Sequence, residues 1–252
     1  MTLRTAWRAV ALGVSLALCF LRFWFGYLRG PMSLERRALW LQSSSRLILA
    51  SLGIATHVEG RPPQRGLVVS NHLSYLDILI YSSVMPCFFV SKLEIRSWPY
   101  FGKAACAGGT IFIDRSSRAS AAIVAGQIKE RLALPIPTLF FPEGTSSDGS
   151  QVLRFHASLF EPAATIGAPV TAAAVRYVLA DERAERELCW FDDTVFVTHL
   201  WKALSVGFTA EVRFGETRVY ADRRSAAAAT HEEVAALRAS SMIEDVQLTG
   251  AE

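Results

Sequence analysis

A histidine and an aspartate five positions apart are the first residues in this chain whose types and spacing could do chemistry. His72 and Asp77 lie between two apolar runs, at residues 67–70 and 78–81. The first run predicts a buried strand, and the residues from Ser74 onward predict a helix. An imidazole can remove a proton from a hydroxyl group, and a carboxylate can fix which ring nitrogen does so. The pair therefore predicts a general base at a strand end, where α/β proteins bind ligands.

The same segment also has an ordinary structural interpretation. Ser74 is a favourable residue to cap a helix. Asp77 would then lie in the first turn, where a carboxylate stabilises the helix N-terminus. On that interpretation His72 is a loop residue without a chemical role. The pattern Asn-His-x4-Asp at residues 71–77 leaves both interpretations open.

Two later segments also place polar groups at the ends of predicted strands. Arg115 follows the strand predicted at residues 110–114, and a guanidinium group binds phosphate through paired hydrogen bonds. A Glu-Gly-Thr turn at residues 143–145 follows the strand predicted at residues 138–141. Its backbone N–H groups and its hydroxyl suit a glycerol or phosphate acceptor. The structural alternatives are a solvated arginine and a common turn.

In this order and spacing, these segments resemble the glycerolipid acyltransferase family typified by bacterial lysophosphatidate acyltransferase. The resemblance covers residues 60–180. It rests on Asn-His-x4-Asp at residues 71–77, Gly-Thr-Ile-Phe-Ile-Asp-Arg at 109–115, Phe-Pro-Glu-Gly-Thr at 141–145 and Pro-Val at 169–170. The resemblance implies a membrane-associated enzyme in which a helical N-terminal element precedes an α/β domain.

The resemblance further implies transfer of a fatty acyl group from acyl carrier protein or coenzyme A to the free hydroxyl of a lysolipid. The first acceptor implied is 1-acylglycerol-3-phosphate, which would give phosphatidic acid. His72 becomes the general base and Asp77 orients it, and no metal or cofactor is implied beyond the thioester co-substrate. The residues expected to bind substrate are Asn71, Lys92, Arg115, Glu143, Gly144 and Thr145.

Two departures from the family pattern leave the acceptor open. Many lysophosphatidate enzymes have arginine directly after Glu-Gly-Thr, and this chain has Ser146. They often have lysine where this chain has His156. Both changes remove fixed positive charge where an acceptor phosphate would be held, although Lys92, Arg115 or Arg154 can supply charge instead. Lyso-ornithine lipid or another lysophospholipid is therefore an alternative acceptor, and a non-catalytic lipid-binding protein is an alternative of another class.

Motifs of several other protein classes are missing from the sequence. The chain has no Gly-x-Ser-x-Gly elbow, no His-Glu-x-x-His helix and neither of the glycine-rich nucleotide loops. Its four cysteines are widely separated, so they predict neither a zinc site nor a disulfide framework. The sequence therefore argues against a serine hydrolase, a zinc protease or a nucleotide-binding enzyme.

The elements that must position these residues alternate between strand-like and helical patterns. We expect strands at residues 67–70, 88–91, 110–114, 138–141, 170–177 and 211–216. We expect helices at residues 74–84, 97–105, 116–132, 157–166 and 231–241. This alternation predicts an α/β fold, with a mixed sheet covered by helices.

The N-terminal segment predicts membrane association. Residues 9–28 are apolar apart from Ser15 and Arg22, and the region after Leu21 is bulky and basic without a small-residue cleavage site, so we expect a retained anchor rather than a cleaved signal peptide. Residues 33–52 predict an amphipathic helix, which can lie in a membrane interface or pack on the protein core. Residues 1–55 contain seven arginines and one acidic residue, and the arginines alternate with apolar residues. This pattern favours an anionic membrane surface over nucleic acid as the binding partner.

These patterns predict two parts in the chain. Residues 1–58 are expected to form N-terminal membrane-anchoring helices, and residues 59–252 an α/β acyltransferase domain. The expected location is the cytoplasmic face of the bacterial inner membrane. The expected partners are membrane lipid, a lysolipid acceptor and an acyl carrier protein or coenzyme A thioester, with no nucleic acid.

Overall fold

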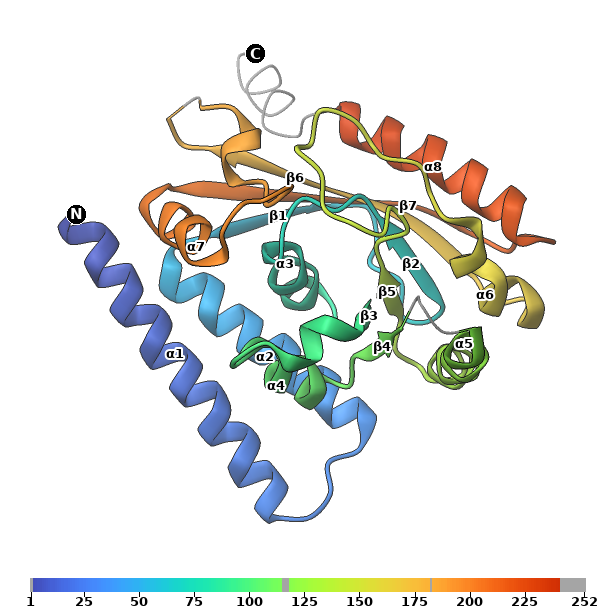
Figure 1. The fold of residues 1–252 in the computed structure, drawn as a ribbon, viewed down its shortest axis with the longest axis horizontal. Coiled ribbons are helices and arrows are strands. Elements are labelled where there is room, and N and C mark those ends of the chain that lie inside the picture. Colours follow the sequence, from blue (N-terminus) through green and yellow to red (C-terminus); the bar gives the residue numbers. More distant parts are fainter. Residues whose placement is uncertain (1, 115–117, 182, 241–252) are drawn as a thin grey trace.

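The fold is built on a mixed seven-stranded sheet. The computed structural model describes residues 2–114, 118–181 and 183–240 (Figure 1). The strand order is β1-β7-β6-β2-β5-β3-β4. The strands are β1 (Ala55–Glu59), β2 (Leu67–Ser70), β3 (Phe88–Lys92), β4 (Ile111–Ile113), β5 (Thr138–Phe140), β6 (Val170–Leu179) and β7 (Phe208–Arg218). All neighbouring pairs are parallel except β6 with β7, so the expected mixed α/β fold is confirmed.

Helices cover both faces of this sheet because its strands are apolar on both sides. Val68 of β2 and Val175 of β6 contribute to the core on one face, whereas Val69 and Ala174 contribute to the core on the other. In Figure 1, α8 lies above the sheet, and α1, α2 and α4 lie below it. The first core takes in α1 (Leu3–Leu28), α2 (Leu34–Leu52), α3 (Leu76–Val84), α4 (Phe101–Gly108) and α7 (Phe196–Ser205). The second takes in α5 (Arg118–Leu132), α6 (Glu161–Ile166) and α8 (Arg223–Ala239).

The N-terminal helices α1 and α2 form a pair on one side of the domain. Ser33 caps α2 by accepting a hydrogen bond from the backbone N–H of Arg36. Gly53 ends the helix with a φ of 65°, a left-handed conformation that favours glycine. The apolar stripe of α2, which includes Leu41 and Ile48, is buried in the core. Of the two alternatives for this helix, the structure shows the one that packs on the core.

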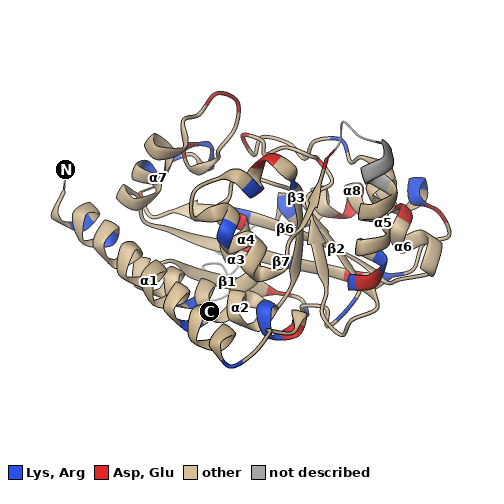
Figure 2. Ribbon diagram, turned by 60° about the horizontal axis from the view of Figure 1, so that its bottom comes forward, with Lys and Arg blue, Asp and Glu red and all other residues tan. Residues whose placement is uncertain are grey.

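Helix α1 exposes a continuous apolar face. Among the described residues it is the one helix long and apolar enough to cross a membrane, judged by length and composition alone. Figure 2 shows basic but no acidic residues along it. Its inward side packs on α2 and α7 through residues such as Arg8 and Cys19. Its outward side carries Leu3, Trp7, Val10, Val14, Leu18, Leu21, Trp24, Phe25 and Leu28.

The sequence missed a strand and an α-helix and misplaced other elements. Strand β1 was not predicted, because its residues are mostly exposed and show no apolar run. The boundary expected between residues 58 and 59 falls inside β1, which pairs in register with β7. Helix α7 was not predicted either, and α8 begins at Arg223 rather than at residue 231. The helix expected at residues 97–105 is instead a 3₁₀ turn, Leu93–Ser97, followed by α4, because a proline at residue 99 interrupts the backbone hydrogen bonds.

Candidate active site

The expected site residues gather at one edge of the sheet. Strands β2, β5, β3 and β4 are neighbours and run parallel, so their carboxyl ends share this edge. His72 follows β2, Glu143 follows β5, and Lys92 ends β3 with an exposed side chain. Arg115 lies outside the described residues. The edge is therefore where the sequence-predicted groups that the structure describes come together.

His72 and Asp77 form a hydrogen-bonded pair. Nδ1 of His72 lies 2.7 Å from Oδ2 of Asp77. The same oxygen accepts the backbone N–H groups of Leu73 at 2.8 Å and Ser74 at 3.1 Å. Asp77 is fully buried, whereas the His72 side chain is 20% exposed. The carboxylate accepts a hydrogen bond from the Nδ1–H group. Nε2 of the neutral imidazole is therefore left free to accept a proton.

Tyr177, from β6, completes a chain of three side chains. Its hydroxyl donates a hydrogen bond to Oδ1 of Asp77, so both carboxylate oxygens have partners. Burial, together with the nearby Asp77 charge, raises the pKa of Tyr177 well above its usual value. The phenol therefore stays neutral and acts as a donor. No local sequence pattern identified this residue, because it lies 100 positions away in the chain.

The ring of His72 is fixed by the strand end beside it. It stacks on the ring of Phe141, with 4.0 Å between centroids and 9° between planes. The backbone N–H of Ser147 donates to the His72 carbonyl at 2.9 Å. The turn after β5 thus holds the imidazole both through its ring face and through its backbone.

Glu143 lies in this turn as a buried carboxyl group. Neither of its side-chain oxygens meets the geometry of a hydrogen bond. Burial raises its pKa to about 8, and the Asp77 charge adds to this effect, while backbone groups of His72 and Leu153 oppose it. Below that pH the side chain is a neutral acid that can donate a hydrogen bond into the site.

The next residues of the turn have different environments. Gly144 has a φ of 75°, and its N–H donates to the Phe141 carbonyl at 3.0 Å. Glycine suits this left-handed conformation. Thr145 is exposed, so its hydroxyl is accessible to a ligand at the sheet edge. The Thr145 hydroxyl thus stays available for the expected acceptor contact, whereas the Gly144 N–H is used within the turn.

Asn71 differs from the expected substrate contact. Its side chain is buried, and both ends of its amide bond the backbone of Val175 in β6. Nδ2 donates to the Val175 carbonyl at 3.0 Å, and Oδ1 accepts the Val175 N–H at 2.9 Å. Asn71 therefore locks the turn after β2 to the neighbouring strand β6, and its polar atoms are already used within the protein.

A segment around Trp190 lies across the site and was not anticipated. The backbone N–H of Trp190 donates to the carbonyl of Leu73 at 2.8 Å, and its carbonyl accepts a hydrogen bond from the hydroxyl of Ser146. This segment thereby joins the turn after β2 to the turn after β5. Ser146, at the position where many related enzymes have arginine, is thus used for an internal contact.

Aromatic side chains form an apolar wall beside the turn after β2, at residues 71–75. The ring of Tyr75 lies 5.0 Å from that of Phe196, 5.8 Å from that of Trp190 and 6.1 Å from that of Phe101. Trp98 packs on Trp190 and Phe196. Such a cluster, next to the candidate base His72, suits a ligand with an apolar chain.

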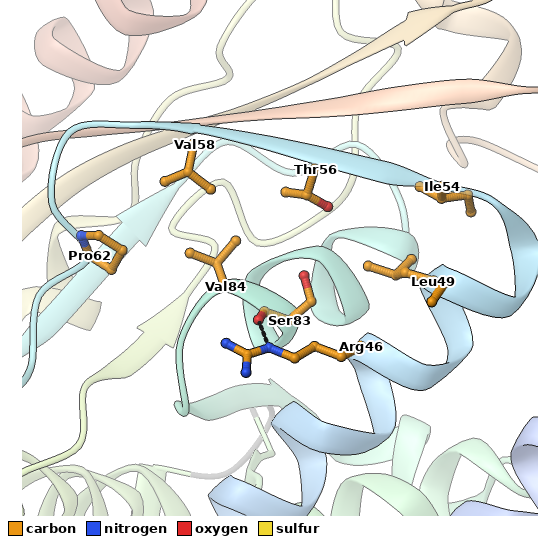
Figure 3. Close-up of a pocket in the computed structure, with 9 residues that line it drawn as sticks. Arg46, Leu49, Ile54, Thr56, Val58, Pro62, Ser83 and Val84 are labelled. Atoms are coloured by element: carbon orange, nitrogen blue, oxygen red, sulfur yellow. Dashed lines mark hydrogen bonds between the residues drawn. The ribbon is translucent and has the colours of Figure 1, made fainter.

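A separate pocket lies at the opposite end of α3. It has a volume of about 460 Å³ and opens between α2, β1 and the end of α3 (Figure 3). Nε of Arg46 donates to the carbonyl of Ser83 at 2.7 Å within it. His72 precedes the start of α3, so this pocket does not contain the candidate base. Within residues 2–114, 118–181 and 183–240, no group of three or more histidine, cysteine, aspartate or glutamate side chains could hold a metal.

Comparison with known proteins assigns the chain to a family. Residues 54–176 match the family model described as Acyltransferase. A lyso-ornithine lipid O-acyltransferase of Rhodobacter capsulatus is 41% identical over 169 residues, covering 64% of this chain and 60% of that protein. A 1-acyl-sn-glycerol-3-phosphate acyltransferase of Neisseria meningitidis serogroup B is 39% identical over 181 residues, covering 70% of this chain and 69% of that protein.

A solved structure has the same fold. The crystal structure of the 1-acyl-sn-glycerophosphate acyltransferase PlsC from Thermotoga maritima superposes with a TM-score of 0.65. The match covers 99% of this chain and 96% of that one at 18% identity. The fold and the sequence matches agree with the geometry at the end of β2, and this chain belongs to the acyltransferase family.

Proposed function

We propose that this acyltransferase moves a fatty acyl group from a thioester to the free hydroxyl of a lysolipid, with His72 as the general base. The observation that carries the proposal is the bond from Nδ1 of His72 to the buried carboxylate of Asp77. It leaves Nε2 of the neutral ring to accept a proton, on a side chain that is 20% exposed at this edge of the sheet. The homologous acyltransferases of known acceptor support a lysolipid substrate.

In this reaction the acceptor alcohol itself is the nucleophile. Nε2 of His72 takes the hydroxyl proton while the oxygen attacks the thioester carbonyl and forms a C–O bond. The Asp77 carboxylate stabilises the imidazolium that results. As the tetrahedral intermediate collapses, the C–S bond breaks and the imidazolium returns its proton to the leaving thiolate. The products are the diacyl lipid and the free thiol of the carrier.

The first acceptor we propose is 1-acylglycerol-3-phosphate, giving phosphatidic acid. The Neisseria relative, named for that substrate, supports this choice. Lyso-ornithine lipid is the second candidate, and a specific contact favours it. Ser146 replaces the arginine found in many lysophosphatidate enzymes, and its hydroxyl bonds the Trp190 carbonyl. The described part of this turn therefore offers no guanidinium to a phosphate monoester at that position.

The membrane is the proposed location of the substrate. The exposed apolar face of α1 supports membrane association, and the basic residues of the N-terminal segment support an anionic leaflet. We place the enzyme on the cytoplasmic face of the bacterial inner membrane, where acyl carrier protein and coenzyme A thioesters are available. The donor is one of these two thioesters.

A panel of acceptors tests the proposal. Purified full-length protein is offered lysophosphatidate, lyso-ornithine lipid and neutral lysophospholipids, each with acyl carrier protein and coenzyme A thioesters. We expect acyl transfer to at least one lysolipid. His72→Ala should abolish it, whereas His57→Ala, which changes an exposed histidine on β1, should not. Lipid binding without turnover from any donor would instead identify a non-catalytic lipid-binding protein, and full activity of His72→Ala would exclude the mechanism.

A further inference from the structure

We propose that helix α7 is a second membrane-contact element that lies in the same bilayer surface as α1 and brings the active-site entrance to the lipid. This inference rests on the proposed function, since it concerns how that enzyme reaches a lysolipid. Helix α7 spans Phe196–Ser205, beyond the residues that match the family model.

The outward face of α7 is apolar where a soluble helix is normally polar. Val197 is 71% exposed and Trp201, one turn later, is 44% exposed. Val195, just before the helix, is 64% exposed. The inward face buries His199 and Ala203. Two large apolar side chains on one side of a ten-residue helix make a surface that water disfavours.

A buried arginine joins this helix to α1. Nη1 of Arg8 donates to the carbonyls of Leu204 at 3.2 Å and Val206 at 2.9 Å, at the C-terminal end of α7. A cation there satisfies carbonyls that have no partner within the helix. Arg8 is itself buried, so separating the helices would leave a charge and two carbonyls without these bonds. The two helices are therefore fixed relative to one another.

The exposed apolar residues of α7 lie close to its contact with α1. Leu204, whose backbone carbonyl accepts from Arg8, follows Trp201 by three positions and Val197 by seven. Both exposed side chains are therefore within about two helical turns of that contact. Figure 1 shows the N-terminal half of α1 beside α7. The exposed apolar residues of α7 therefore lie near the N-terminal half of the outward stripe of α1.

The inward face of α7 reaches the catalytic turn. The ring of Phe196 packs on Tyr75 at 5.0 Å, and Nδ1 of His199 lies 3.0 Å from the Tyr75 hydroxyl. Tyr75 follows Ser74, whose backbone N–H bonds the Asp77 carboxylate. One short helix therefore separates lipid on its outer side from the aromatic wall of the site on its inner side.

The composition of the joint surface favours a bilayer over a protein partner. Trp7 and Trp24 of α1 and Trp201 of α7 are all exposed, and indole rings favour the membrane–water interface. Helix α1 contains no acidic residue, and Arg4 is exposed near its start. Basic and aromatic side chains together suit an anionic lipid surface.

A fluorescent label at Val197 tests the inference directly. The full-length protein carries Val197→Cys in a Cys106→Ser background, since the other native cysteines are buried. An environment-sensitive fluorophore is attached, and vesicles of phosphatidylethanolamine and phosphatidylglycerol are added. Matched labels go on Val14→Cys of α1 and on Ile123→Cys of α5. The Ile123 side chain is 65% exposed, and α5 lies far from α1 and α7 in Figure 1. We expect blue-shifted emission at positions 14 and 197 and none at position 123.

Binding and turnover provide the second measurement. Val197→Glu combined with Trp201→Glu should bind these vesicles about tenfold more weakly, because two apolar contacts become charged. The double variant should keep its acyl transfer to lysolipid dispersed in detergent, and Ile123→Glu should behave as the unmodified protein.

A water-like signal at position 197 beside a lipid signal at position 14 would overturn the inference while leaving acyl transfer intact. A signal at position 197 that depends on protein concentration instead of lipid would also overturn it, in favour of a second copy of the chain. Absence of acyl transfer in detergent would count against the proposed function alone.

Discussion

The hydroxyl of Tyr177 on β6 donates a hydrogen bond to Asp77, and the same carboxylate accepts a hydrogen bond from Nδ1–H of His72. The carboxylate is fully buried and also accepts two backbone N–H groups. Four donors around one carboxylate fix its position. His72 and Asp77 lie within one short segment of the sequence, but Tyr177 on a different strand holds the Asp77 carboxylate in place.

We expect Tyr177→Phe to lower kcat by about tenfold to a hundredfold, because the variant loses one hydrogen bond to a charged group. KM should change little, since Tyr177 is buried behind Asp77. Steady-state kinetics on the preferred lysolipid measure both constants. Tyr81→Phe is the matched control, because it removes another buried phenol, bonded to Ser70 at 2.6 Å, that does not bond Asp77. Equal kcat losses in the two variants would indicate a general packing effect.

Asp77→Asn should lower kcat by at least about a hundredfold. The side chain keeps its size, but it loses the charge that stabilises the imidazolium, and its amide can present a donor to Nδ1. The ring would then carry its proton on Nε2 and could not act as the base. Circular dichroism and thermal unfolding verify that the variant is folded. Retention of most of the activity would show that His72 works without an orienting anion.

Glu143 should make stability depend on pH. Burial raises its pKa to about 8 from an ordinary value of 4.5. Between these values the folded protein holds a proton that the unfolded chain has released, so the free energy of unfolding falls as the pH rises, by at most about 1.4 kcal/mol per pH unit. Glu143→Gln cannot ionise and should flatten this slope. Denaturant unfolding of both proteins at several pH values from about 4 to about 9 measures the difference, since this range spans the two pKa values. Parallel curves would contradict a protonated Glu143.

Asn71→Ala should destabilise the fold by about 1–3 kcal/mol, because it leaves the buried N–H of Val175 without a partner and removes one of the two donors to the Val175 carbonyl, which also accepts from Arg238. Urea unfolding measures this loss. The sequence had instead predicted a substrate contact for Asn71. Unchanged stability together with a raised KM for the acceptor would favour that earlier prediction.

The sequence located those parts of the site that are local in the chain. His72 and Asp77 are five positions apart within one strand–turn–helix segment, so local patterns could place them near each other. Strand β2 was predicted to the residue because its side chains are all buried and apolar except for the last. Short-range spacing is therefore sufficient for the pair and for the edge of the sheet at which it lies.

Long-range partners were outside the reach of such patterns. The Tyr177 bond to Asp77 joins residues 100 positions apart, and the Ser146 bond to Trp190 joins residues 44 apart. The Trp190 segment and helix α7 carry no motif, so their placement over the site depends on the folded sheet. Local periodicity does not encode contacts of this kind.

The last prediction concerns the acceptor and the residue after the Glu-Gly-Thr turn. Ser146→Arg adds a guanidinium where the internal bond to Trp190 now lies. If this position faces the acceptor headgroup, the ratio of kcat/KM for lysophosphatidate to that for lyso-ornithine lipid should rise about tenfold, which corresponds to one charge-assisted hydrogen bond. Ser146→Ala removes the same internal bond without adding charge, so it should lower both values and leave their ratio unchanged. An unchanged ratio in Ser146→Arg would show that the headgroup is recognised elsewhere on the sheet edge, with Lys92 at the end of β3 as the next position to vary.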